Sequence, residues 1–217
     1  MKNLSTSNWN LFRNYTVERI RAASVLWEPY WHVEVEDILH PELFALTQSC
    51  WPDYDNTIMV TDNSLFDHLS PHRRYTYTNR HDLNGWVDFY NNIQNHPDIV
   101  DAVWSFEQLH LPSCISVDSS LWEDYRGYEF ENHVDKSDIG IAWHIYVYCS
   151  GEGQNYGTSL NLPDGTKVKT FPFKPNFCYF NRVDAMAWHS IDPVDADLRR
   201  SVMTRFNVRR DGLSLED

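Results

Sequence analysis

Four residues in the second half of the chain have the types and spacing of a metal site with a carboxylate-binding residue. His133 and Asp135 are separated by one residue. On an extended strand both side chains therefore point the same way and can hold one ion. With His189 they form two imidazoles and one carboxylate, the ligands of non-haem iron(II). A structural zinc site would need a fourth protein ligand, and calcium would need more oxygens. Catalytic zinc is compatible with these ligands, but it would not require the later Arg200.

An arginine after the second histidine predicts an organic-acid co-substrate, because a guanidinium matches a carboxylate in bidentate geometry and stays charged. Strand alternation over residues 198–208 favours Arg200, whose face carries mainly apolar side chains and is expected to line the inside of a barrel. Thr204 lies on the same face and would share the carboxylate. Arg199 is the alternative, since an irregular start to the strand would exchange the faces, and Arg205 is expected to point away.

A buried carboxylate usually also receives a hydroxyl group. Tyr148 is the first candidate and Tyr146 the second, because both lie on one alternating face of the apolar run 143–148. Core packing explains either aromatic side chain equally well. His144 shares this face, and a hydrogen-bonded core or surface histidine is the favoured interpretation of it.

Other His-x-acid pairs arise among the ten histidines, and none is followed by both a histidine and an arginine at the same intervals. Surface or helix-capping roles are the favoured interpretation of these pairs. They lie at residues 32–34, 40–42 and 96–98.

The complete set resembles the iron(II)- and 2-oxoglutarate-dependent dioxygenases, which have a double-stranded β-helix (jelly-roll, cupin-like) core. The resemblance is to prolyl-hydroxylase-like and phytanoyl-hydroxylase-like members, and it covers about residues 120–208. Short segments around the ligands add to it: Gly127-Tyr128, Gly157-Thr158-Ser159-Leu160 and Ala187-Trp188-His189.

This resemblance implies an oxidoreductase that uses Fe(II), 2-oxoglutarate and O2 to hydroxylate a C–H bond of an amino acid, a peptidyl residue or another small molecule. Asp135 favours hydroxylation over halogenation, because the halogenases of the family replace this carboxylate with a small residue. Desaturation and ring formation stay open. The alternatives are another metal-dependent enzyme on a cupin-like barrel and a non-catalytic metal-binding β-barrel module.

The elements that must position these residues are expected to form one mainly β domain over residues 1–217. Residues 1–119 would supply a strand and buttressing helices, and residues 120–208 the metal-binding β-helix core. The patterns predict a strand over 31–35 and helices over 41–48, 84–92 and 98–110. Turn signals separate short strands after Tyr128.

Composition limits the partners and the location. The net charge of −13 argues against a nucleic-acid partner and slightly favours a small or basic substrate. Arg80, Tyr125 and Arg126 are candidate substrate-binding residues. The four cysteines have no metal or disulfide spacing and are expected to be reduced thiols. No signal or membrane-spanning run is found, so a soluble cytoplasmic protein without a membrane partner is expected; the oligomeric state stays open.

Overall fold

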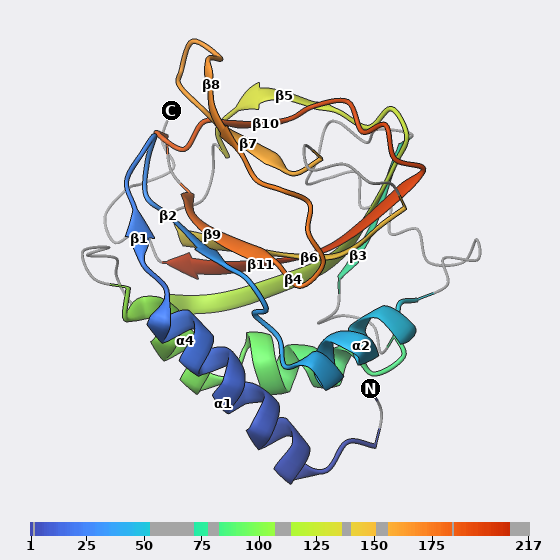
Figure 1. The fold of residues 1–217 in the computed structure, drawn as a ribbon. Coiled ribbons are helices and arrows are strands. Elements are labelled where there is room, and N and C mark those ends of the chain that lie inside the picture. Colours follow the sequence, from blue (N-terminus) through green and yellow to red (C-terminus); the bar gives the residue numbers. More distant parts are fainter. Residues whose placement is uncertain are drawn as a thin grey trace, which may run out of the picture.

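A computed structural model describes residues 1, 3–52, 72–77, 83–106, 114–135, 140–150, 156–183 and 185–208. Over these residues two antiparallel sheets face each other, and a layer of helices covers the outer side of the larger sheet (Figure 1). The space between the two sheets is called the barrel interior below. From β4 onward the chain passes back and forth between the two sheets, which is the winding of a double-stranded β-helix.

The larger sheet has seven strands in the order β1-β2-β9-β6-β11-β4-β3. Their bounds are β1 Val25–Leu26, β2 His32–Val35, β3 Arg73–Tyr77, β4 Cys114–Tyr125, β6 Gly140–Cys149, β9 Cys178–Val183 and β11 Leu198–Val208. The smaller sheet has four strands in the order β5-β10-β7-β8. Their bounds are β5 Phe130–His133, β7 Thr158–Asn161, β8 Lys167–Thr170 and β10 His189–Ile191.

The helices carry local start signals in their sequences. They are α1 Thr6–Ala22, α2 Pro41–Ser49, α3 Trp86–Phe89, the π-helix η1 Tyr90–Gln94 and α4 Pro97–Trp104. In α2 and α4 a proline occupies the first turn, and the preceding His40 or His96 side chain accepts a hydrogen bond from a backbone N–H. Two of the competing His-x-acid pairs are therefore helix caps, as predicted.

The main hydrophobic core lies between the larger sheet and the helices. Trp143 stacks between Phe180 and Phe206, with ring centroids 5.3 and 6.3 Å away, and Trp104 of α4 contacts Phe206 at 6.0 Å. The apolar face of β11, with Val202 and Phe206, therefore faces the helices. The expectation that this face lines the barrel interior is wrong. Its apolar side chains are buried against the helices and not against the opposite sheet.

The mainly β fold class is confirmed, and so are the strand at 31–35 and the helix at 41–48. The pattern at 84–92 forms α3 and η1, and that at 98–110 forms α4, with residues 107–110 outside the described part. Helix α1 was not predicted, although its Ser5 cap and the spacing of Trp9, Phe12 and Ile20 are helix signals.

All four cysteines are free thiols. Among the described residues, no helix has both the length and the apolar character that a membrane crossing requires.

Candidate metal centre

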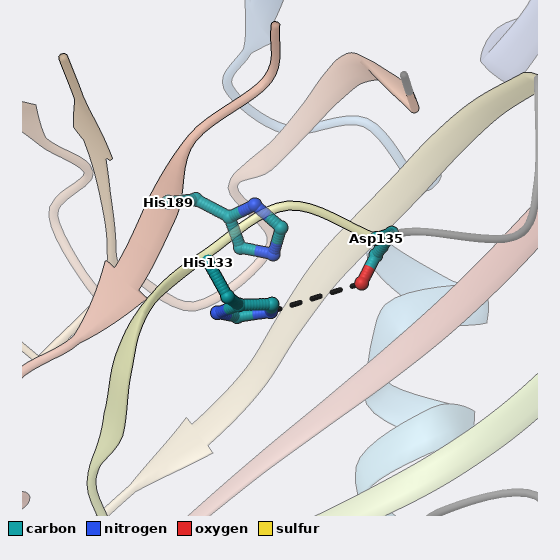
Figure 2. A group of neighbouring side chains, drawn as sticks. All are labelled: His133, Asp135 and His189. Carbon is teal, nitrogen blue, oxygen red and sulfur yellow. Dashed lines mark ion pairs between the residues drawn. The ribbon is translucent and has the colours of Figure 1, made fainter. Parts of the chain in front are cut away.

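His133, Asp135 and His189 come together at one end of the smaller sheet (Figure 2). His133 ends β5 and His189 begins β10, and the two residues are directly opposite in this antiparallel pair. Their rings are 4.2 Å apart between centroids. One ligand atom from each of the three residues lies within 4.8 Å of the others. The sequence prediction that these residues converge is therefore met by the geometry.

Backbone hydrogen bonds orient both imidazoles. Nδ1 of His133 lies 2.8 Å from the carbonyl of Glu131, and Nδ1 of His189 lies 2.9 Å from the carbonyl of Ala187. Because a carbonyl only accepts, each Nδ1 carries a proton, so in the neutral form of each ring the lone pair lies on Nε2. A metal-binding histidine needs this tautomer, so the donor set fits a divalent transition metal.

The electrostatics favour the ligand forms of these side chains. Burial, followed by the neighbouring His189, lowers the pKa of His133 and keeps its ring neutral. Burial acts to raise the pKa of Asp135, but Arg205 and the two histidines hold it below its usual value. Nη2 of Arg205 lies 3.2 Å from Oδ2 of Asp135, while Oδ1 lies 3.7 Å from Nε2 of His133. Arg205 thus faces the centre, and the expectation that it points away is wrong.

Arg199 lies in the barrel interior, on the same face of β11 as Arg205. Its side chain is 4% exposed, and its Nε donates to Oδ2 of Asp124 at 2.8 Å. It also donates through Nη1 to the backbone carbonyl of Tyr156 and lies 5.3 Å from the ring centroid of Phe173. A buried guanidinium therefore stands in the same interior as the metal ligands.

Arg200 and Thr204 lie on the opposite, helix-covered face. Nε of Arg200 donates to Oε1 of Glu123 at 2.8 Å, and its guanidinium lies 5.5 Å from the ring centroid of Trp51. Thr204 accepts a hydrogen bond of 2.6 Å from Gln94 of η1. Their predicted orientation toward the barrel interior is wrong, and Arg199, the alternative, has that orientation.

Tyr146 and Tyr148 lie on opposite sides of β6, although they are two residues apart. Arg200 pairs with Tyr148 and Ser201 with Tyr146, so Val147 is an extra residue that forms a bulge. The Tyr146 hydroxyl accepts from the backbone N–H of Thr158 at 3.0 Å, and its ring stacks 4.0 Å from that of Phe173. Tyr148 is 40% exposed. Only Tyr146 is turned toward the barrel interior.

Gly157 allows β7 to approach this tyrosine. A Cβ at Gly157 would lie 2.0 Å from the carbonyl oxygen of Phe171 and 3.0 Å from the Tyr146 hydroxyl. Any larger side chain would push residue 157 away from Phe171 and Tyr146. This close approach explains why position 157, which precedes Thr158, is a glycine.

The interior also contains residues to which the sequence analysis gave no role in the site. His144 is stacked on Tyr179 with centroids 4.6 Å apart, and burial, followed by His189, lowers the pKa of His144 to about 3. This neutral ring agrees with a core histidine. Thr158 shares a hydrogen bond of 2.7 Å with the Tyr179 hydroxyl. Alternation along β6, β7 and β9 could have grouped these residues only if the inward face had been known.

Two of the three candidate substrate-binding residues, Tyr125 and Arg126, make contacts away from the centre. The Tyr125 hydroxyl donates to Glu123 at 2.7 Å on the helix-covered face. Arg126 is 59% exposed in its side chain and pairs with Asp195 and Asp197. Arg80 lies outside the described residues.

Glu123 joins three side chains on the helix-covered face, because its buried carboxylate accepts hydrogen bonds from Trp51, Arg200 and Tyr125. We expect Glu123→Ala to lower the free energy of unfolding by about 3–5 kcal/mol, since three donors lose their acceptor. Urea denaturation measures this loss. Metal binding by the folded fraction should be unchanged, and a loss of metal without a loss of stability would contradict this structural role.

Comparison with known proteins identifies the fold. A prolyl 4-hydroxylase from Phytophthora capsici has a TM-score of 0.63 and 14% identity, over 96% of this chain and 68% of that chain. A Trichoplax adhaerens prolyl hydroxylase, solved with a peptide fragment of hypoxia inducible factor, has a TM-score of 0.57 and 12% identity, over 95% of both chains. A 2OG-Fe(II) oxygenase family protein from Burkholderia pseudomallei has a TM-score of 0.56 and 8% identity, over 98% and 96%.

The fold is the double-stranded β-helix of the 2-oxoglutarate- and iron(II)-dependent oxygenases. Neither protein-family models nor curated proteins gave a match. The likeness is therefore carried by the three-dimensional structure of the double-stranded β-helix, whose interior here contains the His133, Asp135 and His189 cluster.

Proposed function

We propose that this chain is an iron(II)- and 2-oxoglutarate-dependent oxygenase that hydroxylates a C–H bond. The observation that carries this proposal is the convergence of two Nε2 lone pairs and one carboxylate in the interior of a double-stranded β-helix. The donor set is the one preferred by non-haem iron(II). The solved structures with this fold include prolyl hydroxylases and a 2OG-Fe(II) oxygenase family protein.

His133, Asp135 and His189 would hold the iron, and Arg199 would pair with the distal carboxylate of 2-oxoglutarate. Arg199 replaces Arg200 in this role because its guanidinium is buried in the barrel interior. Iron(II) and 2-oxoglutarate, when bound, supply the oxidising chemistry with O2 and yield succinate and carbon dioxide. The protein contributes binding, orientation and exclusion of water.

Tyr146 is the hydroxyl-bearing residue that we assign to the far side of the co-substrate site. Its hydroxyl is buried beside Thr158, and its ring and the Arg199 guanidinium both contact the ring of Phe173, at centroid distances of 4.0 and 5.3 Å. Burial raises the pKa of Tyr146, which keeps the phenol protonated and able to donate to a carboxylate.

The substrate belongs to the class of amino acids, peptidyl residues or other small molecules. The Trichoplax adhaerens enzyme binds a peptide fragment in its solved structure, which supports a peptidyl substrate for this chain. Asp135 supports hydroxylation as the outcome, because its carboxylate takes the place that a halide would need.

Anaerobic titration of the protein with iron(II) and then 2-oxoglutarate tests the proposal. We expect a weak visible charge-transfer band and a rise in melting temperature that needs both components. Succinate release measured against a panel of amino acids and peptides would then identify the substrate. If iron binds but 2-oxoglutarate has no effect, another metal-dependent activity is favoured. If no metal binds, the chain is a non-catalytic module.

A further inference from the structure

A buried carboxylate in the barrel interior is shared by two arginines. Asp124 of β4 is 1% exposed in its side chain and lies between Arg73 of β3 and Arg199 of β11. Arg73 donates to Asp124 through Nε and through Nη2, the latter at 3.1 Å, and Arg199 donates through Nε at 2.8 Å. The register places Asp124 directly opposite both arginines, so the cluster follows from strand pairing.

The cluster carries one uncompensated positive charge. Burial acts to raise the pKa of Asp124, but the two guanidinium groups hold it below its usual value, so the carboxylate is ionised. Asp124 and Arg199 alone would form a neutral pair with little attraction for an anion. Arg73 restores a net positive charge at a site of low solvent access, where a charge acts strongly.

Aromatic rings fix the position of the Arg73 guanidinium. It lies 3.8 Å from the ring centroid of Tyr128 and 4.3 Å from that of Trp122, and its side chain is 19% exposed. A guanidinium that covers two rings and donates to a buried carboxylate has little freedom to swing into solvent. The extra charge is therefore built into the fold.

The charged cluster and the candidate metal centre share the barrel interior. Arg199 and Arg205 lie on the same face of β11, and Nη2 of Arg205 lies 3.2 Å from Oδ2 of Asp135 in the centre. Arg199 and Tyr146 both contact the ring of Phe173, at centroid distances of 5.3 and 4.0 Å. Among the hydrogen bonds of the described residues, none uses Nη2 of Arg199, so this donor can serve a ligand.

We propose that Arg73 is a positioning residue for the co-substrate: through Asp124 it keeps the Arg199 anchor net positive, so that the site selects a 2-oxo acid with a second, distal carboxylate. This inference rests on the proposed function. It adds Arg73 to the co-substrate site and states that the net charge of the cluster determines which 2-oxo acid binds. Arg73 acts through Asp124 and the local field, not as a metal ligand.

The experiment measures dissociation constants of 2-oxoglutarate and pyruvate for the manganese(II)-loaded full chain by calorimetry. Pyruvate has the same 2-oxo acid group without a distal carboxylate. We expect Arg73→Gln to raise the dissociation constant of 2-oxoglutarate by about tenfold or more and to leave that of pyruvate nearly unchanged. Asp124→Asn should not weaken 2-oxoglutarate, because it removes a competing negative charge. The double variant Arg73→Gln/Asp124→Asn has a single positive charge again, on Arg199. Its dissociation constant for 2-oxoglutarate should return to within about threefold of the wild-type value.

Lys167→Gln is the control, since it removes one positive charge from an exposed side chain that pairs with Asp192, and it should not alter either constant. Recovery in the double variant, with the pyruvate constant unchanged in all three variants, would exclude a purely structural role for Arg73, because a distorted site would weaken the binding of both ligands. If Arg73→Gln does not fold, tighter binding of 2-oxoglutarate by Asp124→Asn, with pyruvate unchanged, supports the proposal, and weaker binding overturns it.

Two results separate this inference from the proposed function. Wild-type protein that binds manganese(II) but no 2-oxoglutarate would overturn both. The role of Arg73 alone would be overturned if the wild type binds 2-oxoglutarate tightly and Arg73→Gln binds it equally well. It would also be overturned if the double variant does not regain the affinity that Arg73→Gln loses.

Discussion

His189→Ala is expected to raise the iron(II) dissociation constant by more than about 100-fold, because it removes one of the three side chains that form the candidate metal cluster among the described residues. Asp135→Ala should have a similar effect, since it also removes the only carboxylate of the set. Anaerobic calorimetry or elemental analysis after gel filtration measures the loss. Succinate formation should fall with it.

His96→Ala is the matched control for this prediction. His96 also begins a His-x-Asp sequence, but its Nδ1 caps α4 by accepting from the N–H of Asp98 at 3.3 Å. The variant should lose about 1 kcal/mol of unfolding free energy and retain its iron. Normal iron content in His189→Ala would refute the ligand assignment.

Arg199→Ala is expected to weaken 2-oxoglutarate by about 100-fold or more while iron binding is retained. The variant removes the buried guanidinium that would meet the distal carboxylate, and loss of one partner of a buried charge pair costs about 2–5 kcal/mol. Calorimetry with 2-oxoglutarate on manganese(II)-loaded protein measures the effect. Arg199→Lys keeps the charge but not the fork geometry, and should be intermediate.

The neighbouring Arg200→Ala provides the control, because its side chain bonds Glu123 on the helix-covered face. This variant should lose stability but retain its affinity for 2-oxoglutarate. If Arg200→Ala weakens the co-substrate and Arg199→Ala does not, the assignment of the anchor is reversed.

The cluster of candidate metal ligands could be predicted from the sequence because the chemistry of its residues is local. His133 ends β5 and Asp135 follows two positions later, and only one later histidine is followed by arginines at a suitable distance. Ligand type and short spacing determine which ion can bind, whatever the details of packing. The helix caps at His40 and His96 were predictable for the same reason, since a cap depends on its own first turn.

The anchor could not be identified in this way, because alternation defines two faces of a strand without saying what covers each. The apolar face with Val202 and Phe206 resembled a barrel lining, but it packs on the helices. The barrel interior takes the polar face with Arg199 and Arg205, whose guanidinium groups pair there with Asp124 and Asp135.

The sequence by itself determined the fold class and which three side chains form the candidate metal cluster, since residue type, spacing and alternation are properties of short segments. The tertiary structure decided which arginine and which tyrosine face the centre. Packing of helices on one side of β11 and the bulge at Val147 set those orientations. It also brought Arg73, Asp124 and Arg199 together across three strands, a contact that depends on register and leaves no motif along the chain.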